Sequence, residues 1–260
     1  MRLAAVQTAA LARRAVVGTL RTPQALFPSL FFPLVLMAIF TASFAAAPGR
    51  IPGFPPVRGF LAFALSGAVL QGILIGGTVA GAAFALDIEG GFFDRLVASP
   101  ASRSAILAGR LAGGVALALA QTVLFLGVGI AFGARVQGGA AGVALLLVLA
   151  GLLAVAVSGL GIVLALRSGS SEAVQGTFPL FFALLFFSSA FFPRETMTGW
   201  FRTVADVNPI SHLVEAMRAQ VISSGETRTT LIGLGIAVAL AAIAVAACFQ
   251  AFRGRLRGAA

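Results

Sequence analysis

Apolar residues in this chain gather into six long runs that are separated by shorter polar stretches. A helix that crosses a membrane needs about 20 apolar residues, because each residue rises about 1.5 Å and the hydrocarbon layer is about 30 Å thick. The runs are too long and too continuously apolar for barrel strands, which alternate with a period of two. The pattern predicts an all-α integral membrane protein with six transmembrane helices, at residues 25–47, 59–86, 111–134, 139–166, 173–192 and 229–252.

The segment ahead of the first run, residues 1–24, is polar and has helical periodicity. One half of its helical wheel holds Gln7 and the four arginines, Arg2, Arg13, Arg14 and Arg21. Alanines and other apolar residues fill the other half, so we expect an interfacial helix that lies along the membrane. A cleaved secretory signal is the alternative, because "FAAAP" offers a cleavage site. The first apolar run is, however, longer than the ~7–15 residues of a signal core.

The polar segment 87–110 concentrates charge in a chain where only 10% of residues are charged. Its sequence pairs Phe92 with Leu96, and Phe93 with Val97, at the i, i+4 spacing of a helix. Ser99 and Pro100 are expected to end that short helix, and Ser102 or Ser104 to cap the next one. Two interpretations remain open for this segment. It is either an interfacial loop anchored by its phenylalanines or a docking element for another protein.

A second amphipathic segment lies between the fifth and sixth runs, at residues 193–228. Its first half places Met197, Trp200, Phe201 and Val204 at the spacing of one helix face. Asn208 is a candidate helix cap, with Pro209 in the first turn of the helix that follows. We expect a pair of short amphipathic helices here, and one interpretation is a hairpin that rests at the outer membrane surface.

Composition supports a membrane location and suggests an orientation. The chain is 59% hydrophobic, with a mean hydropathy of +1.03, which is more apolar than a soluble domain can be. Positive residues are enriched on the cytoplasmic side of membrane proteins. With both termini in the cytoplasm of a cell membrane, the inner segments hold eleven arginines and the outer segments seven. We therefore expect a multi-pass protein with both termini cytoplasmic, and its charge of +10 does not indicate nucleic-acid binding because no aromatic platform accompanies it.

Several kinds of chemistry are disfavoured by the residues that are missing from the sequence. All 18 basic residues are arginine, so the chain has no lysine for a nucleotide-binding P-loop. His212 and Cys248 are the only residues of their types, which predicts neither a metal site nor an internal disulfide. Membrane serines lack a histidine or lysine partner in the pattern, so no catalytic residues are predicted. We expect no cofactor on this chain, and any use of ATP must involve another subunit.

Two stretches of sequence resemble a known family. "DIEGGFFDRLVASPASRSAILAGR" is similar to the cytoplasmic loop of ABC-2 type transporter permeases, and "FFPRETMTGWFRTVADVNPISHLVEAMRAQV" to their segment between spans five and six. Within that family, the sequence of these two stretches most resembles drug-export permeases of the daunorubicin-resistance type. Thr198 departs from the pattern, where many relatives have proline, which affects only the local turn.

The resemblance implies a homodimeric permease that pairs with two separate ABC ATP-binding subunits, on which ATP and magnesium would bind. It also implies that the segment 87–110 is a coupling loop whose helix contacts the ATPase. The coupling residues that it implies are Glu89, Phe92, Phe93, Asp94 and Arg95. For the segment 193–228 it implies re-entrant helices that close the outer mouth, with Trp200, Phe201, Asn208 and Pro209 as gate candidates.

The apolar runs contain four candidates for the substrate path. Gln71 is polar at membrane depth, where it either bonds to another helix or lines a cavity. Phe178, Phe182 and Phe186 form an i, i+4, i+8 stripe that either packs in the core or lines an apolar cleft. Small-residue pairs such as Gly77 and Gly81 permit close helix approach, within one subunit or between two.

These observations predict a permease that exports a hydrophobic drug, antibiotic or lipid-like molecule by alternating access. No ionised residue lies at the middle of a run, which argues against coupling to an ion gradient. The alternatives within the family are a polysaccharide exporter and an ion-extruding permease. Outside it, an ATP-independent channel or a membrane-embedded enzyme remains open.

Overall fold

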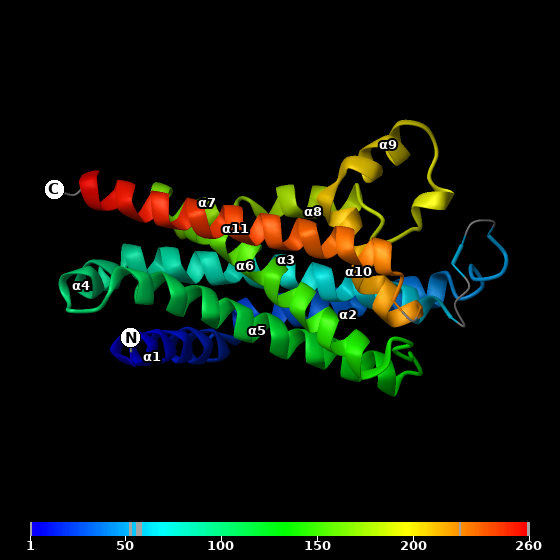
Figure 1. Cartoon of the computed structure of the whole chain (residues 1–260), viewed down its shortest axis with the longest axis horizontal. Helices are drawn as coiled ribbons and strands as arrows, with labels where there is room; N and C mark the ends of the chain where they lie inside the picture. The colour runs from blue at the N-terminus through cyan, green and yellow to red at the C-terminus, as the bar shows by residue number, and fades with distance from the viewer. Residues whose placement is uncertain (1, 52–53, 56–58, 224, 259–260) are drawn as a thin grey trace.

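The computed structural model describes residues 2–51, 54–55, 59–223 and 225–258, and in these ranges the protein is a bundle of helices without strands (Figure 1). The start of α1 (Arg2–Leu20), the end of α11 (Thr227–Gly258) and α4 (Phe92–Ala98) lie at one end of the bundle, which we call the α4 end. Helix α9 (Gly199–Val207) lies at the other end, the α9 end. The elements in chain order are α1 (Arg2–Leu20), α2 (Pro23–Ser43), α3 (Phe60–Glu89), α4 (Phe92–Ala98), α5 (Arg103–Ala131), α6 (Gly139–Ser168), α7 (Ser171–Gln175), α8 (Phe178–Phe186), η1 (Arg194–Thr196), α9 (Gly199–Val207), α10 (Pro209–Ile222) and α11 (Thr227–Gly258).

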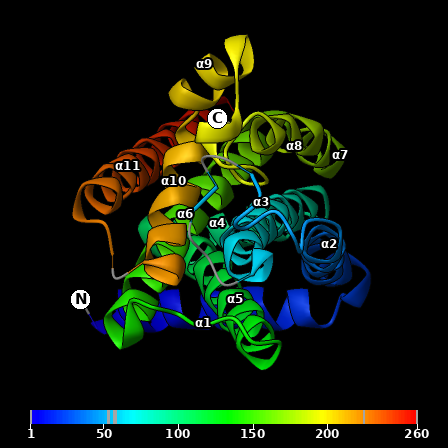
Figure 2. The ribbon, with the colours of Figure 1, turned by 90° about the vertical axis from the view of Figure 1, so that its right-hand side faces the viewer.

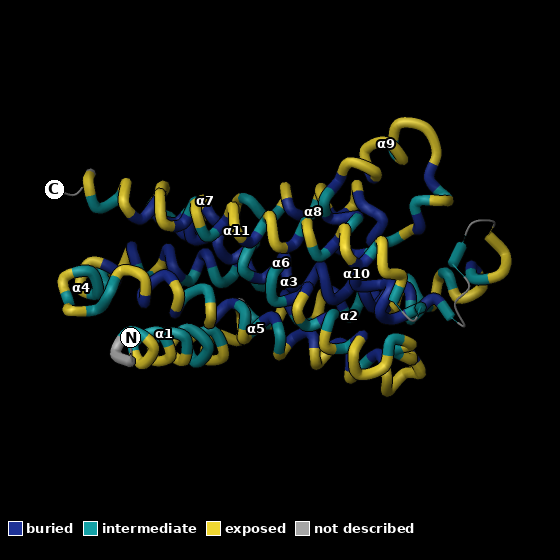
Figure 3. Tube along the Cα trace, viewed as in Figure 1, coloured by how far each residue is buried: buried dark blue, intermediate teal, exposed yellow. Residues whose placement is uncertain are grey.

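Five of the described helices are long and apolar enough to cross a membrane: α2, α3, α5, α6 and α11. The prediction of an all-α protein is thereby confirmed. Helix α3 is the most buried of the five, and α2, α5 and α6 pack around it (Figures 2 and 3). Helix α3 is therefore the central helix of the bundle.

The predicted span at residues 173–192 is not a single helix, and that part of the prediction is wrong. The chain forms α7 and α8, interrupted at Gly176 and Thr177, and then turns after Phe187. Pro179 explains the break, because proline has no N–H to donate to the preceding turn and is suited to the start of a helix. This region contributes two short helices instead of a membrane-length one.

Glycine allows α3 and α6 to approach closely. A Cβ added to Gly81 would lie 2.6 Å from the Cα of Gly161 on α6, and one added to Gly77 would lie 2.5 Å from Val157. Distances this short leave no room for a methyl group in either position. The small-residue pair on the second predicted span therefore serves packing within one chain.

Helix α1 is packed against α5 through small residues of the latter. A Cβ at Gly109 would lie 2.5 Å from that of Leu11, and one at Gly113 would lie 2.6 Å from that of Ala15. Figure 2, which looks along the bundle, shows α1 running across it while α2 and α3 are seen nearly end-on. The expected N-terminal helix is thus present, and its position on the membrane surface stays a prediction.

Candidate functional site

Helix α4 and its connections at the α4 end agree with the local signals in the sequence. Gly91 has a φ of 67°, a left-handed conformation that glycine adopts without strain, and this allows the sharp turn from α3 into α4. Ser99 follows the last residue of α4. Ser102 caps α5 by accepting a hydrogen bond of 3.2 Å from the amide of Ala105. The prediction of a short helix between two spans is confirmed.

Phe93 and Phe92, the two aromatic residues that begin α4, lie in different environments. Phe93 is 2% exposed, and its ring contacts those of Phe84 and Phe252 edge-on, with both centroid distances at 5.6 Å. Phe92 is half-buried beneath the guanidinium of Arg14, 3.7 Å from the ring centroid. Phe93 therefore anchors α4 in the interior of the chain, and Phe92 attaches it to α1.

The charged coupling candidates also divide into two groups. The Glu89 carboxylate accepts a hydrogen bond of 2.6 Å from the amide of Ser171, the first residue of α7. Asp94 and Arg95 are exposed on α4, and neither has an ion-pair partner in the described part of the chain. Glu89 is exposed as well, but its carboxylate is engaged by the Ser171 amide, so Asp94 and Arg95 are the two exposed charged candidates without a hydrogen-bond or ion-pair partner among the described residues. The role of all five in coupling stays a prediction.

An ion cluster that the sequence interpretation missed joins α1, α3 and α5 next to α4. The carboxylate of Asp87 accepts two hydrogen bonds of 3.1 Å from the Arg14 guanidinium, and it also pairs with Arg110. The Arg110 side chain is 10% exposed, so Asp87 neutralises a largely buried cation. Partial burial lowers the pKa of Arg14 from its usual value. The cluster fixes α1 and α5 to the last turn of α3.

A large cavity lies between α1, α2 and α3, and the three residues of this ion cluster form part of its lining. Its volume is about 1160 Å³, and its lining includes Phe178 of α8 together with Asp87 and Arg110. Of the four predicted path residues, only Phe178 lines this cavity. Phe182 and Phe186 continue the stripe as rings tilted against one another, with successive centroid distances of 5.3 and 4.9 Å.

Gln71, the fourth path candidate, is buried elsewhere on α3. Its side chain is 2% exposed, and its Nε2 has no hydrogen-bond partner among the described residues. It borders a separate small pocket formed with α2 and with Phe191. A buried amide without a hydrogen-bond partner costs free energy, and the role of Gln71 in the substrate path stays a prediction. The structure does not bring Gln71 together with Phe178.

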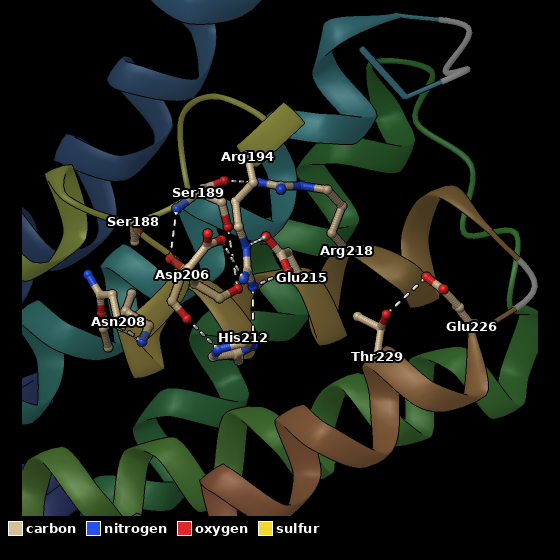
Figure 4. A network of polar contacts seen from close by, with 12 residues as sticks. Ser188, Ser189, Arg194, Asp206, Asn208, His212, Glu215, Arg218, Glu226 and Thr229 are labelled. Atoms are coloured by element: carbon tan, nitrogen blue, oxygen red, sulfur yellow. Dashed lines mark hydrogen bonds and ion pairs between the residues drawn. The ribbon is translucent and has the colours of Figure 1, made fainter. Parts of the chain in front are cut away.

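At the α9 end, an ionic network links η1 to α9 and α10 (Figure 4). The Arg194 guanidinium donates to Glu215 at 2.6 Å and to Asp206 at 3.3 Å. Its Nη2 also lies 3.1 Å from Nδ1 of His212. Burial lowers the pKa of Arg194, but the hydrogen bonds and charges of the two carboxylates outweigh this effect and raise it overall. The network connects η1 to both α9 and α10.

Arg218 is the most deeply buried charged residue among those described at this end. It is 4% exposed, and its Nη2 donates to the carbonyl oxygens of Ser189 at 2.8 Å and Ala190 at 3.1 Å (Figure 4). Its guanidinium carbon lies 3.6 Å from the ring centroid of Phe63 on α3. Burial lowers its pKa to about 10, so the side chain remains charged at neutral pH. Arg218 thus fixes the turn that follows α8, and no local sequence signal identifies this contact.

The outer gate candidates occupy distinct positions around the same turn. Asn208 caps α10 through a hydrogen bond of 2.9 Å from the amide of Ile210, as predicted, and its Nδ2 donates to two carbonyls at the end of α8. Pro209 is in the first turn of α10. Trp200 is 69% exposed and Phe201 packs against it edge-on, with centroids 5.7 Å apart. A gating role for these residues stays a prediction.

Comparison with known proteins gives two concordant findings. The family described as ABC-2 type transporter matches residues 6–222 of this chain. The daunorubicin resistance ABC transporter permease protein DrrB1 of Streptomyces coeruleorubidus is 31% identical over 236 residues. That match covers 89% of this chain and 80% of the relative. The family match over residues 6–222 includes α4, the residues that line the cavity, and α9 and α10.

Proposed function

Because this chain belongs to the ABC-2 type transporter family, whose members are multi-pass permeases that work with a separate ABC ATPase, we propose that it exports a hydrophobic drug, antibiotic or lipid-like molecule. The permease is not itself the ATPase of such a system. The name of the similar permease, which refers to drug resistance, supports the choice of cargo. Transport would proceed by alternating access of the cavity between α1, α2 and α3.

The observation that carries the proposal is the continuity between the cavity and α4. The cavity wall includes Ala82, Leu86 and Asp87 of α3, and α3 continues through a two-glycine turn into α4. Because Phe93 anchors α4 in the core, a force on α4 would be transmitted to α3 and not absorbed by a loose loop. The exposed Asp94 and Arg95 are the charged surface on which an ATPase could act.

In this proposal the α4 end faces the cytoplasm, with both termini on that side. The arginine distribution in the sequence supports that orientation. The α9 end would then form the outer mouth, with α9 and α10 as its re-entrant helices. The hydrogen bonds of Asn208 to the end of α8 would couple these helices to the cavity wall.

The assembly we propose is a permease homodimer with two ATP-binding subunits, which hold the ATP and magnesium. Exposed aromatic and aliphatic side chains on α2 and α8 support the presence of a partner or lipid at that face. They include Phe27, Phe31, Leu180 and Phe186.

Reconstitution into liposomes tests the function directly. The chain and its ATP-binding subunit are expected to move a fluorescent hydrophobic compound against its gradient when ATP is present, and not with a non-hydrolysable analogue. The chain alone should move nothing uphill. Uphill transport by the isolated permease would contradict the proposal, and so would a complex that hydrolyses ATP but transports no compound of a broad hydrophobic panel.

A further inference from the structure

The cavity at the α4 end is lined by an excess of positive charge. Its charged lining residues are one carboxylate, Asp87, and four arginines, Arg13, Arg14, Arg21 and Arg110. Four cations and one anion leave a formal excess of three positive charges. Arg13 and Arg14 lie on α1, and Arg21 directly follows that helix. Arg21 is seven residues after Arg14, which corresponds to about two helical turns.

Two of these arginines are available to a ligand. Asp87 is already occupied by Arg14 and Arg110. Arg13 and Arg21 are exposed, and in the described ranges neither lies within 4.0 Å of a carboxylate. Two cations at the rim of a partly apolar cavity, without a counter-charge from the chain, favour an anion.

Most of the remaining lining residues are apolar, although five polar residues also line the cavity: Thr19, Thr22, Gln24, Thr78 and Gln175. Phe32 on α2, Ile75, Val79 and Ala83 on α3, and Phe178 on α8 all line it. Small-molecule pockets usually measure about 300–1,000 Å³, so a cavity of about 1160 Å³ has room for a ligand with a substantial apolar body. The cavity lining is therefore amphipathic. Three of its four arginines lie on or directly after α1, whereas its aromatic and aliphatic side chains come mainly from α2, α3 and α8.

We propose that this cavity binds an amphiphile with an anionic head, which Arg13 and Arg21 hold while the apolar body lies along α2, α3 and the start of α8. The inference deepens the proposed function and rests on it where the ligand is the exported cargo. An anionic lipid of the bilayer has the same chemistry and could occupy the same cavity. In either case the cavity selects against a cationic head of equal size.

The first experiment compares two probes on the complex with its ATP-binding subunit in detergent. Both probes carry the same fluorophore and acyl chain, and one ends in a phosphate group while the other ends in trimethylammonium. The phosphate probe should bind about tenfold more tightly, and this difference should shrink as salt is raised to 1 M, because exposed charges are screened. Equal affinity for the two probes would overturn the inference.

Variants locate the binding. Arg13→Gln/Arg21→Gln should weaken the phosphate probe about tenfold, to the level of the cationic probe. Arg253→Gln/Arg257→Gln is the matched control, because it removes two exposed arginines from α11 at the same end of the bundle, outside the cavity. Ala83→Trp would fill the cavity and should weaken both probes. Equal loss in the two double variants would assign the effect to overall charge and overturn the site.

The same probes in proteoliposomes distinguish the two sources of ligand. If ATP drives movement of the phosphate probe and Arg13→Gln/Arg21→Gln abolishes it, the anionic amphiphile is the cargo. If the probe binds at the site and stimulates ATP hydrolysis without being moved, a bilayer lipid is the ligand. Export of a neutral compound combined with no charge preference in binding would leave the proposed function intact and overturn only this inference.

Discussion

The ring of Phe93 stands at 89° to the ring of Phe84, with the two centroids 5.6 Å apart, so α4 is joined to α3 by packing as well as by the chain. This contact changes how the coupling hypothesis must be tested. A residue that holds the bundle together cannot also report cleanly on a contact with another subunit. Changes at Phe93 address stability, whereas changes at the exposed charges address coupling.

Phe93→Ala is expected to destabilise the protein by about 3–5 kcal/mol, because it removes a fully buried aromatic side chain and leaves a cavity. Thermal unfolding in detergent, followed by intrinsic fluorescence, measures the loss. Phe92→Ala is the control, since the half-buried Phe92 should give a clearly smaller shift. Equal shifts for the two variants would contradict the assigned positions of the rings.

Asp94→Ala/Arg95→Ala should abolish ATP-dependent export while the permease keeps its membrane level and its unfolding temperature. Both side chains are exposed, and exposed substitutions usually change stability by less than about 0.5 kcal/mol. Export and ATP hydrolysis in proteoliposomes are the measurements, with Arg253→Ala on α11 as an exposed control. Normal export by the double variant would contradict a coupling role for α4 and favour the alternative, in which the segment anchors at the membrane interface.

Asp87→Asn should release α1 from α3, because the Arg14 guanidinium would lose its carboxylate partner. Arg110 would also keep its charge in a largely buried position without a counter-ion. Breaking such a pair costs about 3 kcal/mol or more. Hydrogen exchange is expected to rise in α1 and to stay unchanged in α11. Asp94→Asn is the control for loss of a carboxylate. Adding Arg110→Gln to the Asp87→Asn variant should restore part of the stability, and failure to do so would contradict this account.

Arg218→Met keeps most of the side-chain volume but removes the donors to the carbonyls of Ser189 and Ala190. Loss of these bonds leaves two buried acceptors unsatisfied, at about 1–3 kcal/mol each. Limited proteolysis is expected to cut faster between residues 187 and 193. Arg202→Met on the exposed face of α9 should leave the cleavage rate unchanged. An uncleaved Arg218→Met variant would show that the turn is held by other contacts.

Gly81→Ala should destabilise the bundle, since the new methyl group would lie 2.6 Å from Gly161 on α6. Overpacking of this kind typically costs about 1–3 kcal/mol. Gly127→Ala on α5 is the matched control, because nothing lies within 4 Å of its added Cβ. The midpoint of thermal unfolding should fall for the first variant alone. A similar fall for both would assign the effect to the helix backbone and not to the α3–α6 contact.

Local signals allowed much of this structure to be predicted. Helix α4, its end near Ser99 and the caps at Ser102 and Asn208 depend on residues a few positions apart, and all are present. The break before α8 also has a local signal, Pro179, which the continuous apolarity of the region concealed. Hydropathy alone does not distinguish one long helix from two short ones.

Contacts between distant segments could not be predicted in the same way. The burial of Phe93 depends on Phe252, near the other end of the chain, and the roles of Arg14 and Asp87 depend on the position of α1 across the bundle. A single sequence with i, i+4 periodicity predicts that Phe93 shares a helix face with Val97. It does not predict whether that face contacts another protein or packs into the core of the same chain.

The interruption of the chain between α7 and α8 has a consequence for the surrounding lipid. Together the two helices extend over Ser171–Phe186, which corresponds to about 24 Å at 1.5 Å per residue, less than the roughly 30 Å of a hydrocarbon layer. The bilayer beside them must thin or be replaced by the polypeptide that follows. Activity should therefore depend on acyl-chain length and decline in membranes built from longer lipids, because hydrophobic mismatch is greatest there.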